Sequence, residues 1–326
     1  MVNLGRMPQR RVDVPAQQHP TGRVMPTHNI GPAMTSELGR QRVSVRGKHL
    51  WCGDAPVRVH GVTYGSFAQR RDGAAFPDTA SIRRDFISMH HLGVDTLRTY
   101  EVPPPDLLEI AGELGLRILA GVHHHDWRTE PGTGRAARRR ITDAANRAVD
   151  EALEVLAGRS EILAVAVGNE VPVDLVRLHG RSHVERTLTD MIDRFHDGDP
   201  RLLATYVNFP TTEFVEIPNA DLVAFNVFLE DPEVFRRYVD HLQLISRDRP
   251  LLVTEMGLAS EVHGETAQFD LLARQLGALD ELGTAGGFVF SWTDDWVVSG
   301  EPVPGWGFGI NTENRLPKPS ARAVAE

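Results

Sequence analysis

The sequence alternates eight short stretches rich in apolar residues with longer stretches, most of which have helical spacing of their apolar residues. Short apolar runs are typical of strands buried on both faces, and strands that alternate with helices form parallel sheets. The predicted strands are residues 57–64, 94–100, 116–122, 162–167, 202–208, 222–228, 250–254 and 286–292. Eight such units favour an α/β fold that closes into a single (β/α)8 TIM barrel.

The segments between these strands predict the helices that would cover the barrel. The predicted helices are residues 81–92, 103–113, 136–157, 183–196, 232–246, 266–282 and 320–325. A hairpin is predicted from residue 43, because a Gly53-Asp54 turn separates two short β-prone runs. No Gly-x-Gly-x-x-Gly follows the first strand, which argues against an open dinucleotide-binding sheet.

Residues 1–40 differ from the rest of the chain, since they contain five prolines and no apolar periodicity. They predict a flexible extension, and residues 41–326 a single barrel domain. No apolar stretch has the length of a signal peptide core or a membrane span, so we expect a cytoplasmic protein.

The net charge of -9 is spread along the chain without a basic block, which argues against nucleic acid or a membrane as partner. Cys52 is the only cysteine, so no intrachain disulfide can form. The sequence is compatible with a homo-oligomer but does not specify the oligomeric state.

Two glutamates stand at the ends of buried strands. The apolar run 162–167 leads into Gly168, Asn169 and Glu170, and the run 250–254 leads into Glu255. Because the carboxyl ends of barrel strands share one mouth, these carboxyls can face each other. Two carboxyls about 5 to 5.5 Å apart cleave glycosidic bonds with retention, one as acid and one as nucleophile. Arg98 is the candidate cation that would keep one of them ionised.

Further polar and aromatic residues at the same strand ends are candidate substrate ligands, with no cofactor required. Trp292 is the preferred aromatic residue, since the last strand would direct it inward; Trp127, Trp296 and Trp306 could also stack on a sugar. The predicted substrate-binding residues are Tyr64, Arg98, His124, Asp126, Trp127, Asn169, Asn226 and Trp292.

The run His123-His124-His125-Asp126 raises the question of a metal site. Adjacent residues on a strand point to opposite faces, and no second histidine cluster follows the fifth or sixth strand. We therefore predict no metal, and sugar hydroxyls as the partners of His124, Asp126 or Trp127.

Several motifs in their order along the chain resemble clan A retaining glycoside hydrolases, most closely the barrel domain of family 2. The resemblance covers roughly residues 43 to 326. The motifs are Gly61-Val62-Thr63-Tyr64, Leu92 to Arg98, Asn169-Glu170, Thr254-Glu255-Met256-Gly257, Gly286 to Trp292, and Pro317-Lys318-Pro319. The resemblance implies that Glu170 is the acid/base and Glu255 the nucleophile. It further implies that Asn169 binds the sugar 2-hydroxyl, that Arg98 supports the nucleophile, and that Trp292 is the floor of the -1 subsite.

The sequence departs from family 2 in two ways. Residues 1–40 cannot form the β-sandwich domains that usually precede the barrel, and Phe228 stands where clan members usually place a tyrosine that hydrogen-bonds the nucleophile. The chain is also similar to family 17 β-1,3-glucanases and glucanosyltransferases, whose fourth strand ends in Gly-Asn-Glu. A β-glucan transglycosylase and a non-catalytic carbohydrate-binding barrel are therefore the alternatives to a β-glycoside hydrolase.

Overall fold

The computed structural model describes residues 41–122, 127–130, 132–298 and 300–325. Within these residues eight parallel strands close into a barrel, in the spatial order β10-β11-β4-β5-β6-β7-β8-β9. The strands are β4 (Val59–Thr63), β5 (Thr96–Thr99), β6 (Arg117–Gly121), β7 (Ile162–Asn169), β8 (Ala204–Asn208), β9 (Val223–Asn226), β10 (Leu251–Met256) and β11 (Gly286–Val289). The predicted barrel is therefore confirmed, while the predicted extension at residues 1–40 lies outside the described residues.

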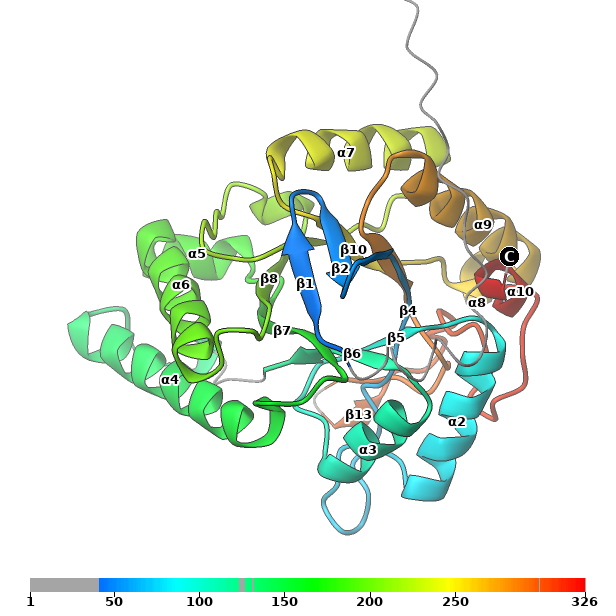
Figure 1. Cartoon of the computed structure of the whole chain (residues 1–326), viewed down its shortest axis with the longest axis horizontal. Helices are drawn as coiled ribbons and strands as arrows, with labels where there is room; N and C mark the ends of the chain where they lie inside the picture. Colours follow the sequence, from blue (N-terminus) through cyan, green and yellow to red (C-terminus); the bar gives the residue numbers. More distant parts are fainter. Residues whose placement is uncertain (1–40, 123–126, 131, 299, 326) are drawn as a thin grey trace, which may run out of the picture.

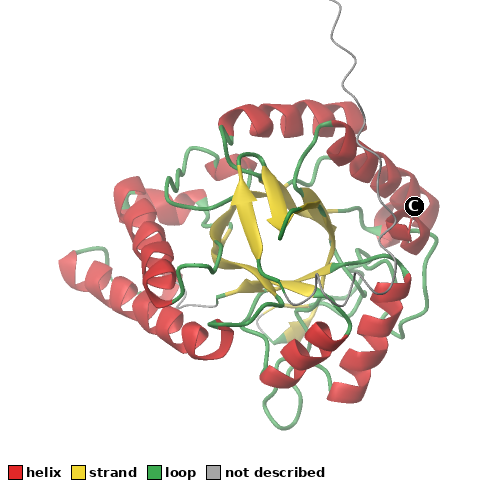
Figure 2. Ribbon diagram, viewed as in Figure 1, coloured by secondary structure: helices red, strands yellow, loops and turns green. Residues whose placement is uncertain are grey.

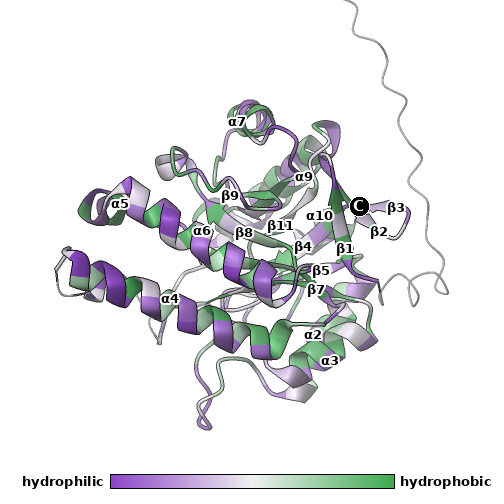
Figure 3. Ribbon diagram, turned by 60° about the vertical axis from the view of Figure 1, so that its left-hand side comes forward, coloured by the Kyte–Doolittle hydropathy of each residue, from purple (hydrophilic) through white to green (hydrophobic). Residues whose placement is uncertain are grey.

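Helices surround the barrel, as the view down its axis shows (Figure 1, Figure 2). They are α2 (Thr79–His91), α3 (Pro105–Glu113), α4 (Arg135–Leu156), α5 (Val173–His179), α6 (Arg181–Gly198), α7 (Pro232–Ile245), α8 (Ser260–His263), α9 (Glu265–Glu281) and α10 (Ala321–Ala325), with 3-10 turns at Trp127–Thr129 and Pro210–Thr212. Each long helix is amphipathic, with its hydrophobic side toward the strands (Figure 3).

Helix α4 illustrates how the sequence sets this packing. Its buried residues include Ile141, Ala145, Val149 and Ala152, which recur every three or four positions and so form one stripe.

Helix α7 shows how a helix start is fixed, because the Asp231 carboxylate accepts hydrogen bonds from the backbone N–H groups of two first-turn residues.

A three-stranded antiparallel sheet precedes the barrel: β1 (Val43–Arg46), β2 (His49–Cys52) and β3 (Ala55–Val57). It crosses the barrel opening in Figure 1 and leads directly into β4, so it covers the end where the strands begin. Val43 and Leu50 pack against Leu119 and Phe288 of the barrel interior. This apolar contact closes one end of the barrel and leaves the carboxyl ends of the strands as the accessible mouth.

Three short elements have no counterpart in the sequence prediction: α5, α8 and the hairpin of β12 (Val297–Val298) and β13 (Glu301–Pro302). They are too short to show a period in the sequence. The last barrel strand also ends earlier than predicted, at Val289. Along the described chain, no helix combines the length and the apolar character needed to cross a membrane.

Candidate active site

The two predicted glutamates lie at the same end of the barrel: Glu170 directly follows β7, and Glu255 lies near the end of β10. Strand pairing is irregular beside both of them, between Ala166 and Asn169 on β7 and between Val253 and Glu255 on β10. Such irregularities redirect side chains next to functional sites. Glu170 also has a positive φ of 48°, a conformation that is rare for a residue with a side chain. Its backbone N–H donates to Val207 O at 2.9 Å, which holds it in this conformation.

Asn226, at the end of β9, connects the two carboxylates. Its amide nitrogen lies 2.9 Å from Glu170 Oε1 and 2.8 Å from Glu255 Oε1. Thr254 Oγ1 donates to Asn226 Oδ1 at 2.8 Å, which leaves the amide nitrogen facing the glutamates. The two Oε1 atoms are therefore within about 6 Å of each other, compatible with the roughly 5 to 5.5 Å carboxyl separation of retaining enzymes.

Glu255 is only 6% exposed, and three donors meet at its Oε1 atom. Arg98 Nη1 forms a buried ion pair with it, Tyr100 Oη donates at 2.7 Å, and Asn226 donates as described above. Arg98 Nη1 also donates to Thr254 O at 2.9 Å, which fixes the guanidinium beside the strand. A carboxyl oxygen that receives this many donors, one of them cationic, is in the environment of an ionised carboxylate.

Glu170 has a different environment, although it is close by. Burial is the largest cause that raises its pKa above the usual range, and the negative charge of Glu255 raises it further. The hydrogen bond from Asn226 and the charge of Arg98 oppose this shift without cancelling it. The two carboxyls thus have different surroundings: burial favours the protonated form of Glu170, whereas Glu255 receives three donors, one of them cationic. Acid and nucleophile roles need such an asymmetry.

Tyr100 belongs to this candidate site, although the sequence did not single it out. Phe228 left open which residue, if any, hydrogen-bonds Glu255 in place of the usual tyrosine; the Tyr100 hydroxyl, one residue past β5, makes such a bond. Phe228 instead packs edge-on against Phe290 and Phe308. The available signal was the spacing of Arg98 and Tyr100, since residues two apart on a strand point to the same side.

Asn169 belongs to the same network. Its Oδ1 atom accepts from Arg98 Nη2 at 2.7 Å and from Asn226 Nδ2 at 3.1 Å. The sequence-predicted residues Arg98, Asn169, Glu170, Asn226 and Glu255 are therefore brought together at one site.

A pocket of about 330 Å³ opens beside Glu170, at the ends of β5, β6 and β7. Arg98, Tyr100, Asn169 and Glu170 lie in its wall, and so does Trp127. The Trp127 ring is almost fully buried, so it supports the wall and offers no open face for stacking. The predicted ligands His124 and Asp126 lie outside the described residues.

Tyr64 and Trp292 lie elsewhere than the sequence analysis expected. Tyr64 is fully buried and donates to Asp85 Oδ2 of helix α2 at 2.9 Å. Trp292 is 2% exposed and lines a second pocket, of about 880 Å³, together with Asp85 and Arg315. Because β11 ends at Val289, strand alternation no longer sets the direction of Trp292, and the predicted sugar-stacking role does not fit its position.

The described residues contain no group of three or more side chains able to hold a metal ion. The histidine run at residues 123–125 lies outside them.

The fold of the chain is similar to that of solved glycosidase structures. A β-glucuronidase from Ruminococcus gnavus matches with a TM-score of 0.72 at 16% identity, over 87% of this chain and 52% of its own. A GH2 β-galacturonidase from Eisenbergiella tayi bound to galacturonate matches with a TM-score of 0.69 at 17% identity, over 87% of this chain and 53% of its own. The chain has the barrel fold of these enzymes.

A β-glucuronidase from Bifidobacterium dentium, complexed with coumarin-3-O-glucuronide, matches over 87% of this chain and 48% of its own, with a TM-score of 0.70 at 17% identity. The chain thus spans about half the length of these neighbours. No protein-family model and no curated protein sequence matches it. The resemblance to family 2 barrels that the sequence motifs predicted is confirmed for the fold.

Proposed function

We propose that the protein is a retaining β-glycoside hydrolase in which Glu255 is the nucleophile and Glu170 the acid/base. The observation that carries this proposal is the contact of one Asn226 amide nitrogen with both carboxylates, because it keeps their Oε1 atoms within about 6 Å of each other. Inverting enzymes hold their carboxyls roughly 6.5 to 9.5 Å apart, to leave room for a water molecule.

In the first step Glu255 attacks the anomeric carbon. Its Oε1 atom is occupied by Arg98, Tyr100 and Asn226, and no described residue donates to Oε2, which is therefore the attacking atom. A bond forms between Oε2 and the anomeric carbon while the glycosidic C–O bond breaks. The proton of Glu170 passes to the leaving oxygen, so that the aglycone departs as a neutral alcohol.

In the second step Glu170, now ionised, takes a proton from a water molecule, which attacks the anomeric carbon of the glycosyl ester. The ester bond breaks and Glu255 leaves as a carboxylate, again bonded to its three donors. Two inversions give net retention. Asn169, whose amide oxygen is held by Arg98, is oriented to offer its NH2 group to a sugar hydroxyl.

The names of the structural neighbours indicate which sugars to assay first as substrates. They are called β-glucuronidases and a β-galacturonidase, so aryl β-glucuronides and β-galacturonides are the first substrates to assay. Aryl β-glucosides, β-galactosides and β-mannosides complete the panel.

Two measurements test the proposal: the turnover of variants of the two glutamates, and the anomeric configuration of the product when azide restores their activity. Glu170→Ala and Glu255→Ala should each abolish most turnover, whereas the exposed Glu301→Ala should not. Azide should restore Glu170→Ala with a β-glycosyl azide as product and Glu255→Ala with an α-glycosyl azide, because azide replaces water in one case and the nucleophile in the other.

The alternatives give different results in the same assays. Turnover that rises when an oligosaccharide acceptor is added, with a longer glycan as product, would indicate a transglycosylase. Absence of turnover on every glycoside, combined with glycan binding, would indicate a carbohydrate-binding barrel and would contradict the proposed hydrolase.

A further inference from the structure

A continuous group of aromatic rings borders the active site on the side of β9 and β11. We call it the aromatic platform; it consists of Phe228, Phe290, Trp296, Trp306 and Phe308. Trp296 and Trp306 are stacked, with ring centroids 5.5 Å apart and planes 4° from parallel. Phe290 contacts all four other rings edge-on, at centroid distances of 4.7 to 5.8 Å.

The platform is continuous with the catalytic residues. The Trp296 ring meets the Tyr100 ring edge-on at 5.5 Å, and the Tyr100 hydroxyl donates to Glu255. Phe228 follows Asn226, which contacts both glutamates, by only two residues. A molecule bound between the glutamates and extending toward β9 therefore reaches the platform next.

The outer rings of the platform are accessible, whereas the inner ones are buried. Phe228 is 40% exposed, and Trp306 and Phe308 are partly exposed. Phe290 and Trp296 lie beneath them and are buried. Large exposed apolar rings at the rim of a polar site mark a surface that binds a ligand.

The backbone presents Trp306 in a fixed conformation. Gly305 and Gly307 on either side of it have positive φ values of 68° and 59°, which a glycine adopts without strain. A Cβ atom on Gly307 would also lie 2.7 Å from backbone and side-chain atoms of Glu261. Gly307 is thus required by the close approach of this turn to helix α8, and Gly305 is favoured by its positive φ alone.

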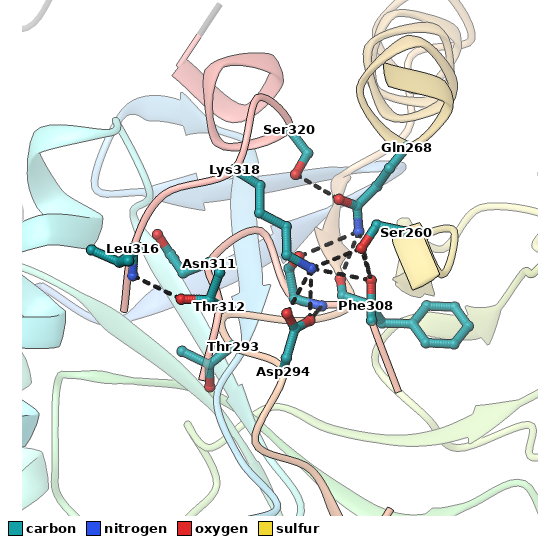
Figure 4. Close-up of polar contacts among 12 residues, drawn as sticks. Ser260, Gln268, Thr293, Asp294, Phe308, Asn311, Thr312, Leu316, Lys318 and Ser320 are labelled. Carbon is teal, nitrogen blue, oxygen red and sulfur yellow. Dashed lines mark hydrogen bonds and ion pairs between the residues drawn. The ribbon is translucent and has the colours of Figure 1, made fainter. Parts of the chain in front are cut away.

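The carbonyl oxygen of Gly307 is held by several donors at once (Figure 4). Ser260 donates to it through its backbone N–H at 2.8 Å and its hydroxyl at 2.9 Å, and Gln268 Nε2 donates at 3.1 Å. The Lys318 ammonium lies 3.4 Å from the same oxygen. Gln268 in turn accepts from the Ser320 hydroxyl at 2.8 Å, which ties the turn to the end of the chain.

Lys318 is itself buried, 6% exposed, at the centre of Figure 4. Its ammonium pairs with Asp294 Oδ2 at 2.7 Å and donates to Ser260 Oγ at 2.9 Å. A buried ion pair contributes little net stability, yet it fixes the geometry of the groups around it. Here it joins the two ends of the segment that carries Trp296, Trp306 and Phe308, so the platform is preorganised.

We propose that the aromatic platform is a second sugar-binding subsite, which takes a neutral ring of a β-linked oligosaccharide whose neighbouring ring lies at the two glutamates. This proposal rests on the proposed function. Aromatic faces bind the C–H faces of a sugar ring and leave its hydroxyls to polar partners, and the rings themselves offer no charge for a uronate. The platform thus makes an oligosaccharide, and not an isolated monoglycoside, the preferred substrate.

The first test measures binding without turnover, so that it stands apart from the proposed hydrolysis. Glu170→Gln protein, with and without Trp306→Ala, is titrated calorimetrically with β-linked tetrasaccharides of glucose, galactose, mannose and xylose. We expect at least one tetrasaccharide to bind, and Trp306→Ala to weaken it about tenfold or more. No binding of any tetrasaccharide, or equal binding with and without Trp306, would overturn the proposal.

The second test uses kinetics, with Phe214→Ala as a matched control because Phe214 is similarly exposed but lies outside the platform. Trp306→Ala and Phe228→Ala should raise KM for the oligosaccharide about tenfold and leave KM for an aryl monoglycoside within twofold. An equal rise for both substrates would indicate a structural or aglycone-binding role and would contradict a second sugar subsite. Thermal unfolding of each variant checks that the fold is retained.

Discussion

The hydrogen bond from Tyr100 to Glu255 leads to a specific prediction for the Tyr100→Phe variant. The substitution removes one hydroxyl and leaves the ring, so the contact with Trp296 is retained. Arg98 and Asn226 still donate to Glu255 Oε1. The only polar change at Glu255, the proposed nucleophile, is the loss of one donor, whose oxygen lies 2.7 Å from the carboxylate. Burial raises the pKa of Tyr100 far above its usual range, so the wild-type hydroxyl remains a donor throughout the assay range.

The expected magnitude follows from the energy of a hydrogen bond to a charged group. Such a bond contributes about 1.5 to 3 kcal/mol, or roughly 10- to 100-fold in rate. The bond is made to a full carboxylate only before attack and after the glycosyl ester breaks, so its loss should slow deglycosylation most. We therefore expect kcat to fall about 10- to 100-fold, and KM to fall with it as the intermediate accumulates.

Pre-steady-state kinetics gives an independent readout. If deglycosylation is the step slowed most, the aryl alcohol of the first turnover should be released in a burst that is larger in Tyr100→Phe than in wild type. Tyr238→Phe is the matched control, because the Tyr238 hydroxyl donates at the same 2.7 Å to Glu213, which lies outside the active-site network. Unchanged kcat and an unchanged burst in Tyr100→Phe would refute the proposed role of the bond from Tyr100 to Glu255.

Three further predictions concern stability. Burial and the negative charge of Glu255 raise the pKa of Glu170 in the folded state. The contribution of Glu170 to the free energy of unfolding is therefore fully present below its unfolded-state pKa and is lost as the pH rises through its folded-state pKa. Glu170→Gln should therefore melt at a higher temperature than wild type at pH 7, and the difference should vanish near pH 4; a lower melting temperature at pH 7 would contradict the raised pKa. Lys318→Met should lower the free energy of unfolding by about 3 kcal/mol in denaturant titrations, since it leaves the partly buried Asp294 carboxylate, 19% exposed, without its cation. Arg194→Met at an exposed pair should change it by less than about 1 kcal/mol. Leu50→Ala, in the sheet that precedes the barrel, should lower the free energy of unfolding by about 2 to 5 kcal/mol. kcat should stay within twofold, because Leu50 lies at the opposite end of the barrel from the glutamates. A large loss of kcat would show that this sheet acts on the site.

The barrel could be predicted because its determinants are local. Each strand is an apolar run and each long helix an amphipathic stripe, as in α4, so the order of elements follows from spacing alone. The placement of Glu170 and Glu255 followed from the same reasoning, since a residue at the carboxyl end of a barrel strand has only one mouth to face.

The directions of side chains beyond the strand ends could not be predicted. Trp292 lies three residues past the last residue of β11, so a small error in the strand boundary changed its expected environment. Tyr64 follows β4 by one residue and turns toward Asp85 of α2 for the same reason. Tyr100 was missed because its spacing from Arg98 shows only that both side chains point to the same side, and nothing in the sequence shows that this side faces Glu255 of β10.

The most direct test of the account is to trap the covalent intermediate. The protein is incubated with 2-deoxy-2-fluoro β-glycosides that carry a good leaving group, matched to the sugars that it cleaves, and the adduct is located by peptide mass spectrometry. We predict one glycosyl adduct per chain, bound to Glu255, which is hydrolysed more slowly in Tyr100→Phe than in wild type. An adduct on any other residue, or an enzyme that releases product with inverted configuration, would contradict it.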